Sequence, residues 1–187
     1  MKRIWIDRAL CLGCKTCELQ CAVERSSLSR TLPEAVRETP LPMARVRVCG
    51  TSTNPFPLQC RHCEEAPCLA ACPGGALRRE ETDGLISLNQ EICRGCWICV
   101  MSCPFGVVTP SAAFQVAVKC DACLHMDKPA CVDGCPTGAL TWGDETAYGK
   151  TLLKRRGAVA MWVKNESTTS KPGGVSLNCL AQEDDRS

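Results

Sequence analysis

The chain has 187 residues, enough for one domain of ordinary size or two small ones. Aromatic residues make up only 4% of it, whereas 18 residues are cysteine, so a conventional hydrophobic core would be thin. The formal charge is only +2, from 22 Lys and Arg against 20 Asp and Glu, and gives no support on charge grounds for nucleic-acid binding.

The first predicted element is a short strand at residues 3–6. The residues around it lack the apolar stretch of a secretory signal, and no run approaches the roughly 18 apolar residues of a membrane helix. We therefore expect a cytoplasmic protein without a transmembrane segment, in a compartment where thiols stay reduced.

Sixteen of the cysteines form four quartets with spacings x2-x2-x3, x2-x4-x3, x2-x2-x3 and x2-x7-x3. The first and third match the run that binds a cubane iron–sulfur cluster in bacterial ferredoxins. Each iron needs one thiolate, so the quartets predict four [4Fe-4S] clusters. The predicted ligands are Cys11, Cys14, Cys17 and Cys21; Cys60, Cys63, Cys68 and Cys72; Cys93, Cys96, Cys99 and Cys103; and Cys120, Cys123, Cys131 and Cys135.

Zinc is the main competing metal, because Cys-x2-Cys pairs also form structural zinc sites. Zinc sites use two separated pairs and need neither a third cysteine at this spacing nor a trailing Cys-Pro, so zinc is the weaker interpretation. A disulfide framework is weaker still. Four bound clusters would bring the net charge to roughly −6 and would supply much of the folding stability.

Other residues in the ligand loops have ordinary explanations. His62 and His125 lie inside quartets that already hold four thiols, so we do not expect them to be ligands. Lys119, Arg61 and Arg94 adjoin predicted ligands, where they either offset cluster charge or are solvated surface side chains.

An internal repeat follows the quartets, since Cys72-Pro73-Gly74-Gly75 recurs as Cys135-Pro136-Thr137-Gly138 and, more loosely, after Cys103. Each copy is expected to turn the chain away from its cluster and to start a strand. Residues 76–79 and 85–88 then predict a β-hairpin across Asp83-Gly84. We also expect residues 3–6 to pair with 139–142, which would nest the second and third quartets inside a unit built from the first and fourth.

In two-cluster ferredoxins the fourth cysteine of one run binds the neighbouring cluster. If the units are nested and the fourth cysteines are exchanged, Cys135 would bind the cluster of the first quartet and Cys21 that of the fourth. In the same way, Cys103 would bind the cluster of the second quartet and Cys72 that of the third. Pairing in sequence order stays open, because residues 107–108 and 114–118 are also typical of a hairpin.

Two segments lie outside the quartets. Residues 22–59 form a proline-rich linker with one strand-like stretch at 45–48, expected on the surface and available to a partner, with weak support for a helix at 29–38. Residues 152–163 predict an element docked on the domain or on a partner, and residues 164–187 are typical of disorder.

The quartets and the start of the chain resemble the four-cluster polyferredoxin subunits of molybdenum or tungsten oxidoreductases, hydrogenases and carbon monoxide dehydrogenase. This resemblance covers about residues 1–148. Within the group, residues 1–4 and 11–24 look most like the iron–sulfur subunit associated with carbon monoxide dehydrogenase. A departure from the pattern is Ala22, which replaces the proline that follows the other three quartets.

The resemblance implies an α+β fold of two nested bacterial-ferredoxin-like units with short β-hairpins and cluster-binding loops. It implies a four-cluster domain at 1–148, with the crossed pairing, followed by an extension at 149–187. It also implies an electron-transfer subunit with no substrate of its own, passing electrons from the carbon monoxide dehydrogenase catalytic subunit to a hydrogenase or another acceptor. Any membrane association would be through a partner. The alternative is the electron-transfer subunit of a formate dehydrogenase, hydrogenase or other molybdenum or tungsten oxidoreductase.

Overall fold

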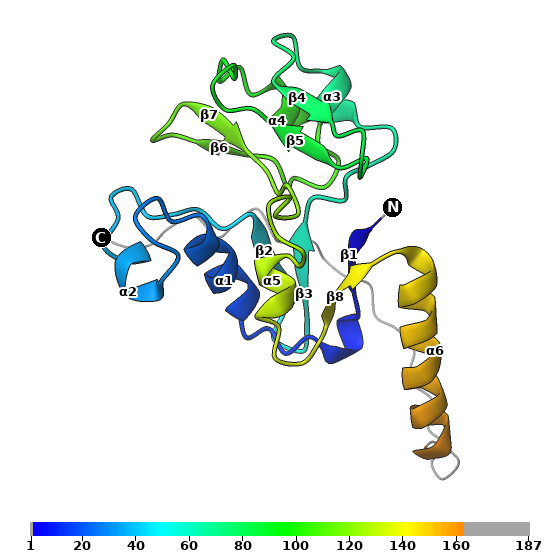
Figure 1. Cartoon of the computed structure of the whole chain (residues 1–187). Coiled ribbons are helices and arrows are strands. Elements are labelled where there is room, and N and C mark those ends of the chain that lie inside the picture. Colours follow the sequence, from blue (N-terminus) through cyan, green and yellow to red (C-terminus); the bar gives the residue numbers. More distant parts are fainter. Residues whose placement is uncertain (1, 163–187) are drawn as a thin grey trace.

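The computed structural model describes residues 2–162, with side chains to residue 155. This part of the chain has an α+β fold, as predicted, in which short helices and two-stranded antiparallel sheets surround the cysteine loops (Figure 1). The helices are η1 (Arg8–Leu10), α1 (Thr16–Glu24), α2 (Leu32–Ala35), α3 (Pro67–Ala70), α4 (Ile98–Ser102), α5 (Ala130–Asp133) and α6 (Glu145–Trp162). The strands are β1 (Arg3–Ile6), β2 (Val46–Thr51), β3 (Asn54–Gln59), β4 (Leu77–Arg79), β5 (Ile86–Leu88), β6 (Thr109–Ser111), β7 (Val116–Val118) and β8 (Leu140–Gly143).

The outer unit joins the two ends of the ferredoxin-like region. Strand β1 pairs with β8, with Arg3 opposite Gly143 and Ile6 opposite Leu140, which confirms the predicted pairing of these distant segments. Helices α1 and α5 pack against each other, and α5 also contacts β8. Their shared core holds Cys17, Cys21, Val46, Cys131, Val132 and Leu140.

The inner unit is the upper lobe in Figure 1, built from residues between the two halves of the outer unit. Strands β4 and β5 form the predicted hairpin, with Leu77 opposite Leu88, and helices α3 and α4 pack beside it. Strands β6 and β7 form a second hairpin. A hairpin in this part of the chain was the reason to consider pairing in sequence order, and the hairpin itself is confirmed. Both hairpins coexist with the β1–β8 pairing, and the units are therefore nested.

The linker is more structured than the sequence suggested. Strands β2 and β3 form a six-residue ladder, and the side chains of Val46, Cys49 and Gln59 are buried, so the expectation that the linker lies wholly over the surface is wrong. Prolines 55 and 57 occupy alternate positions of β3, which is tolerated because a two-stranded ribbon leaves one edge of each strand unpaired. The helix expected at 29–38 is limited to the single turn of α2.

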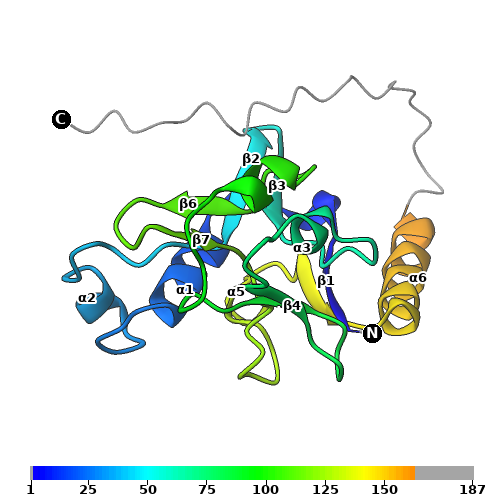
Figure 2. The same cartoon turned by 90° about the horizontal axis from the view of Figure 1, so that it is seen from above.

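Helix α6 packs beside the β1–β8 ribbon (Figure 2). Tyr148 stacks on Trp5, with ring centroids 4.8 Å apart, and donates a hydrogen bond to the Ile6 carbonyl at 3.1 Å. Arg155 forms an ion pair with Asp7 at 3.3 Å. The element predicted at 152–163, for which the sequence did not distinguish helix from strand, belongs to this longer helix, which begins at Glu145 and runs across the expected boundary at 148/149. The expected disorder at 164–187, and Cys179 within it, lie outside the described residues.

None of the described helices is both long and apolar enough to span a bilayer.

Candidate metal centres

The structure gathers the sixteen quartet cysteines into four groups, each made of three cysteines from one quartet and the fourth from another. We call them sites A, B, C and D. They are site A, Cys11, Cys14, Cys17 and Cys135; site B, Cys120, Cys123, Cys131 and Cys21; site C, Cys60, Cys63, Cys68 and Cys103; and site D, Cys93, Cys96, Cys99 and Cys72.

At sites A, C and D the four cysteines line one cavity. At site B the grouping appears in the electrostatics, because the pKa of Cys131 is raised first by burial and then by the charges of Cys120, Cys21 and Cys123. Among the described residues no three His, Cys, Asp or Glu side chains are close enough together to hold a single metal ion. An all-thiol donor set spread around a cavity fits an iron–sulfur core, and the exchange of the fourth cysteine is what crossed ligation requires.

The loops of sites A and D have the same local conformation. Lys15 and Trp97 both adopt a left-handed conformation, with φ of 57° and 61°, and each caps the helix that carries the third cysteine. The glycine two residues earlier is left-handed as well, and a Cβ at Gly95 would lie 2.4 Å from the Gln115 carbonyl oxygen. Glycine is therefore required at position 95 because the turn before β7 approaches the backbone closely there. The sequence alone did not suggest this packing reason.

The Cys-Pro repeat forms the same turn three times. The amides of Gly75, Gly106 and Gly138 each donate to the carbonyl of the preceding cysteine, at 3.3, 3.2 and 3.2 Å. All three glycines are left-handed, with φ of 62°, 60° and 65°, which confirms the predicted role of the glycine. A strand begins after each turn, and the repeat therefore places one cysteine of sites C, D and A at the root of a strand.

Burial raises the pKa of several of these thiols. It raises the pKa of Cys17 to about 12, with the charge of Glu18 adding to the effect, and it raises the pKa of Cys120 to about 12. Cys135 differs: burial acts to raise its pKa, but hydrogen bonds from the Leu140 and Thr137 backbone and the Thr137 side chain outweigh this and lower it. Because ligation needs thiolates, metal binding at these sites must expel protons.

Backbone amides point at several sulfurs. Arg45 N donates to Cys21 Sγ at 3.2 Å, and Ala122 N donates to Cys120 Sγ at 3.3 Å. At sites C and D the donors are the amides of His62 and Ala117, directed at Cys60 and Cys93. Donors of this kind stabilise negative charge on sulfur and tune a bound cluster.

The two histidines of the ligand loops have other partners. His62 is 4% exposed, and its Nδ1 accepts a hydrogen bond from the Ile86 amide at 2.9 Å. Its pKa is lowered to about 3, chiefly by burial and then by the charges of Lys119 and Arg3, so the ring is neutral at physiological pH. His125 instead lies 2.7 Å from Glu24. A buried neutral histidine was not expected from its place in a polar loop.

An ion-pair cluster supports site B. Asp121 lies 2.5 Å from Arg25 and 3.0 Å from Arg45, and it accepts a hydrogen bond from the Cys123 amide at 3.0 Å. Arg25 also donates to Cys123 Sγ at 3.3 Å. One carboxylate therefore connects the end of α1, the linker and the fourth quartet, three segments far apart in the sequence.

Replacing Asp121 by asparagine should destabilise the iron-loaded protein by about 2 kcal/mol, because two partly buried guanidinium groups lose their counter-charge. The expected readout is a lower midpoint of thermal unfolding by circular dichroism. The matched control is Asp133→Asn, which removes a carboxylate from the exposed Lys128–Asp133 pair and should have little effect. Equal midpoints for the two variants would show that the cluster around Asp121 adds no stability.

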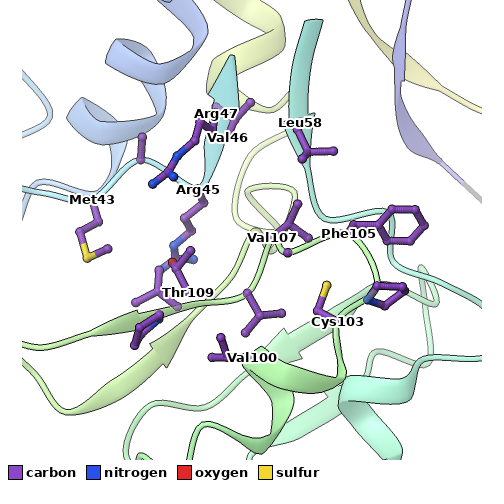
Figure 3. A pocket seen from close by; sticks show the side chains of 16 residues that line it. Met43, Arg45, Val46, Arg47, Leu58, Val100, Cys103, Phe105, Val107 and Thr109 are labelled. Atoms are coloured by element: carbon purple, nitrogen blue, oxygen red, sulfur yellow. The ribbon is translucent and has the colours of Figure 1, made fainter. Parts of the chain in front are cut away.

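A cavity of about 540 Å³ lies between the linker ribbon and the inner unit (Figure 3). Its lining is mostly apolar, with Val46 and Leu58 on the ribbon side and Val107 on the inner side. Cys103 of site C lies at its border. On this side, then, the two units are separated by open space.

Comparison with known proteins agrees with the donor sets. Residues 51–145 match a family model described as a 4Fe-4S dicluster domain. The chain is 38% identical to an iron-sulfur protein of Rhodospirillum rubrum over 162 residues, covering 78% of this chain and 84% of the relative. It is 39% identical to the putative electron transport protein YsaA of Escherichia coli over 156 residues, covering 80% and 94%.

A third relative, the electron transport protein HydN of Escherichia coli, is 36% identical over 171 residues, covering 83% of this chain and 95% of the relative. The family model and the relatives agree with the thiol-lined sites that the fold assembles. The chain belongs to the 4Fe-4S dicluster family and is an electron-transfer protein that carries [4Fe-4S] clusters.

Proposed function

We propose that the sixteen cysteines of sites A to D are the ligands of four [4Fe-4S] clusters, in the crossed arrangement. The observation that carries the proposal is the exchange of fourth cysteines, which brings four thiols from two distant loops to each site. The clusters would supply one-electron redox chemistry when bound. The protein supplies the thiolates, the amide donors to sulfur and the exclusion of water from the buried sites.

The sites lie next to one another in the order A, B, C, D. Cys17 of site A is among the charges that raise the pKa of Cys131 of site B, after burial and the cysteines of its own site. The charge of Cys60 of site C likewise raises the pKa of Cys120 of site B, after burial and the charge of Cys21. Cys68 of site C and Cys99 of site D share one buried core. This order supports a single electron path that runs through both units.

The two ends of this path reach the surface. Of the quartet cysteines, only Cys14 of site A and Cys96 of site D are exposed. An exposed apolar side chain belongs to the loop or helix of each site: Leu12 is 72% exposed in the site A loop, and Met101 is 77% exposed on α4, which carries Cys99 of site D. We propose that redox partners dock at these ends, because exposed apolar side chains are favoured in protein contacts.

For the partners, we propose the carbon monoxide dehydrogenase catalytic subunit as donor and a hydrogenase or another redox enzyme as acceptor, in the cytoplasm. The support is the resemblance of residues 1–4 and 11–24, which includes the exposed site A loop. In this role the protein has no substrate of its own. Residues 1–148 would form the four-cluster domain, and 149–187 would be an extension of it.

A second candidate is the electron-transfer subunit of a formate dehydrogenase, hydrogenase or other molybdenum or tungsten oxidoreductase. This candidate is favoured because the resemblance to the wider polyferredoxin group covers about residues 1–148. Only the first 24 residues point to carbon monoxide dehydrogenase.

The partner is tested by mixing the iron-loaded chain anaerobically with purified carbon monoxide dehydrogenase and following its visible absorbance. We expect bleaching when carbon monoxide is added, because the donor reduces the chain. The control replaces the donor with formate dehydrogenase and formate. Rapid bleaching with formate alone would select the formate dehydrogenase of the second candidate, and bleaching with neither donor would reject both of these enzymes as partners.

A further inference from the structure

Lys119 is an unusual feature of the interior. Its side chain is 2% exposed and is one of the largest fully buried side chains. Its ammonium group donates to the Ile86 carbonyl and, at 2.6 Å, to the Cys120 carbonyl. It forms no ion pair with a carboxylate in the part of the chain that the structure describes. A buried cation is costly unless a negative charge lies near it.

The position of Lys119 indicates where that negative charge comes from. Ile86 lines the cavity of site C, and Cys120 belongs to site B. The ammonium therefore connects the two central sites at the point where the chain passes from the inner unit to the outer unit. Burial raises the pKa of Cys68 at site C, and the charge of Lys119 acts against that rise. The thiolates of these two sites are its natural counter-charges.

Other polar groups close this junction. Arg3 of the outer unit donates to the carbonyls of Arg61 and His62 of the inner unit. The ring of His62 is buried and its Nε2 has no hydrogen-bond partner within the described residues. The units thus meet at a polar contact here.

Burial separates Lys119 from the other basic residues that adjoin cysteines. Arg61 and Arg94 are exposed, and water and salt screen their charges. The charge of Lys119 acts in an interior of low dielectric constant, where the same charge has a larger effect. The sequence placed these three residues in one class, and the fold separates them.

We propose that Lys119 is a positioning residue that raises the reduction potentials of the clusters at sites B and C and so sets how readily electrons cross between the units. The inference rests on the proposed cluster ligation. A fixed positive charge favours the state that holds one more electron, so each adjacent cluster accepts an electron more readily. The charge also holds together the Ile86 and Cys120 carbonyls at the junction.

The test is an anaerobic potentiometric titration of the iron-loaded full chain, followed by electron paramagnetic resonance. Lys119→Met removes the charge and the donors, whereas Lys119→Gln removes the charge but keeps a donor. In both variants we expect one or two of the four midpoint potentials to fall and the others to stay. Arg61→Gln, which removes an exposed charge beside a cysteine of site C, should leave all four unchanged.

Several outcomes would overturn the proposal. The four potentials could stay at the wild-type values in both variants, or all four could shift together. Wild-type potentials in Lys119→Gln alone would show that hydrogen bonding, not charge, is responsible. A large iron loss from both variants would make Lys119 a structural residue. If the wild-type chain itself holds far fewer than about sixteen irons, the proposed ligation fails, whereas full loading with unchanged potentials defeats only the role of Lys119.

Discussion

Iron removal is expected to abolish the folded structure of this protein. Cysteines are part of the core of both units: Cys17, Cys21 and Cys131 are three of the six buried residues in the outer core, and Cys68 and Cys99 are two of the seven in the inner core. Aromatic residues make up only 4% of the chain, so little conventional apolar area is left to offset the conformational entropy of folding. Without metal the buried thiols would be small apolar groups that no longer connect distant loops.

The measurement is far-UV circular dichroism of the anaerobic protein before and after chelation, with a thermal scan of each sample. We expect the iron-loaded protein to unfold cooperatively and the iron-free protein to show no transition. Restoring iron and sulfide under reducing conditions should restore the transition, which controls for irreversible damage. A cooperative transition in the iron-free chain would show that the apolar core suffices.

The second large effect concerns the crossed ligation. Cys21→Ala should remove a ligand from site B, whereas Cys135→Ala should remove one from site A, although Cys21 belongs to the first quartet and Cys135 to the fourth. Each variant is expected to lose about four of sixteen irons. The two substitutions are chemically identical, so each serves as the control for the other.

The exposed thiol of Cys14 reports which site has been lost. A thiolate bound to iron does not react with a maleimide, so Cys14 should be labelled in Cys135→Ala and protected in Cys21→Ala. Labelling is located by mass spectrometry of peptides after anaerobic treatment of the folded protein. The reverse result, with Cys14 labelled only in Cys21→Ala, would establish that the first quartet binds its own cluster without exchange of the fourth cysteine.

Local chemistry explains why so much could be predicted. The Cys-Pro turns at residues 72, 103 and 135 depend on one proline and one glycine each, and all three form as expected. The hairpin of β4 and β5 follows from alternating residues around Asp83-Gly84. The β1–β8 pairing spans the whole domain, yet it was predictable because each strand flanks a quartet at an end of the region.

The errors arose where neighbours in space decide the outcome. Pro55 and Pro57 suggested an irregular linker, but β3 pairs with β2 because its other edge needs no partner. His62 and Lys119 looked like polar loop residues, yet both are buried where the two units meet. Both are hydrogen-bonded to the backbone of Ile86, which is more than twenty residues away from either.

By itself the sequence determined the kind of metal chemistry, because the count, spacing and softness of the cysteines are local properties that suit iron–sulfur clusters. It also determined the turns and hairpins next to them. Only the tertiary structure decided which fourth cysteine joins which loop, which sites reach the surface at Cys14 and Cys96, and which of three similar cations is buried. These properties depend on contacts between segments far apart in the chain, and such contacts leave no local signal.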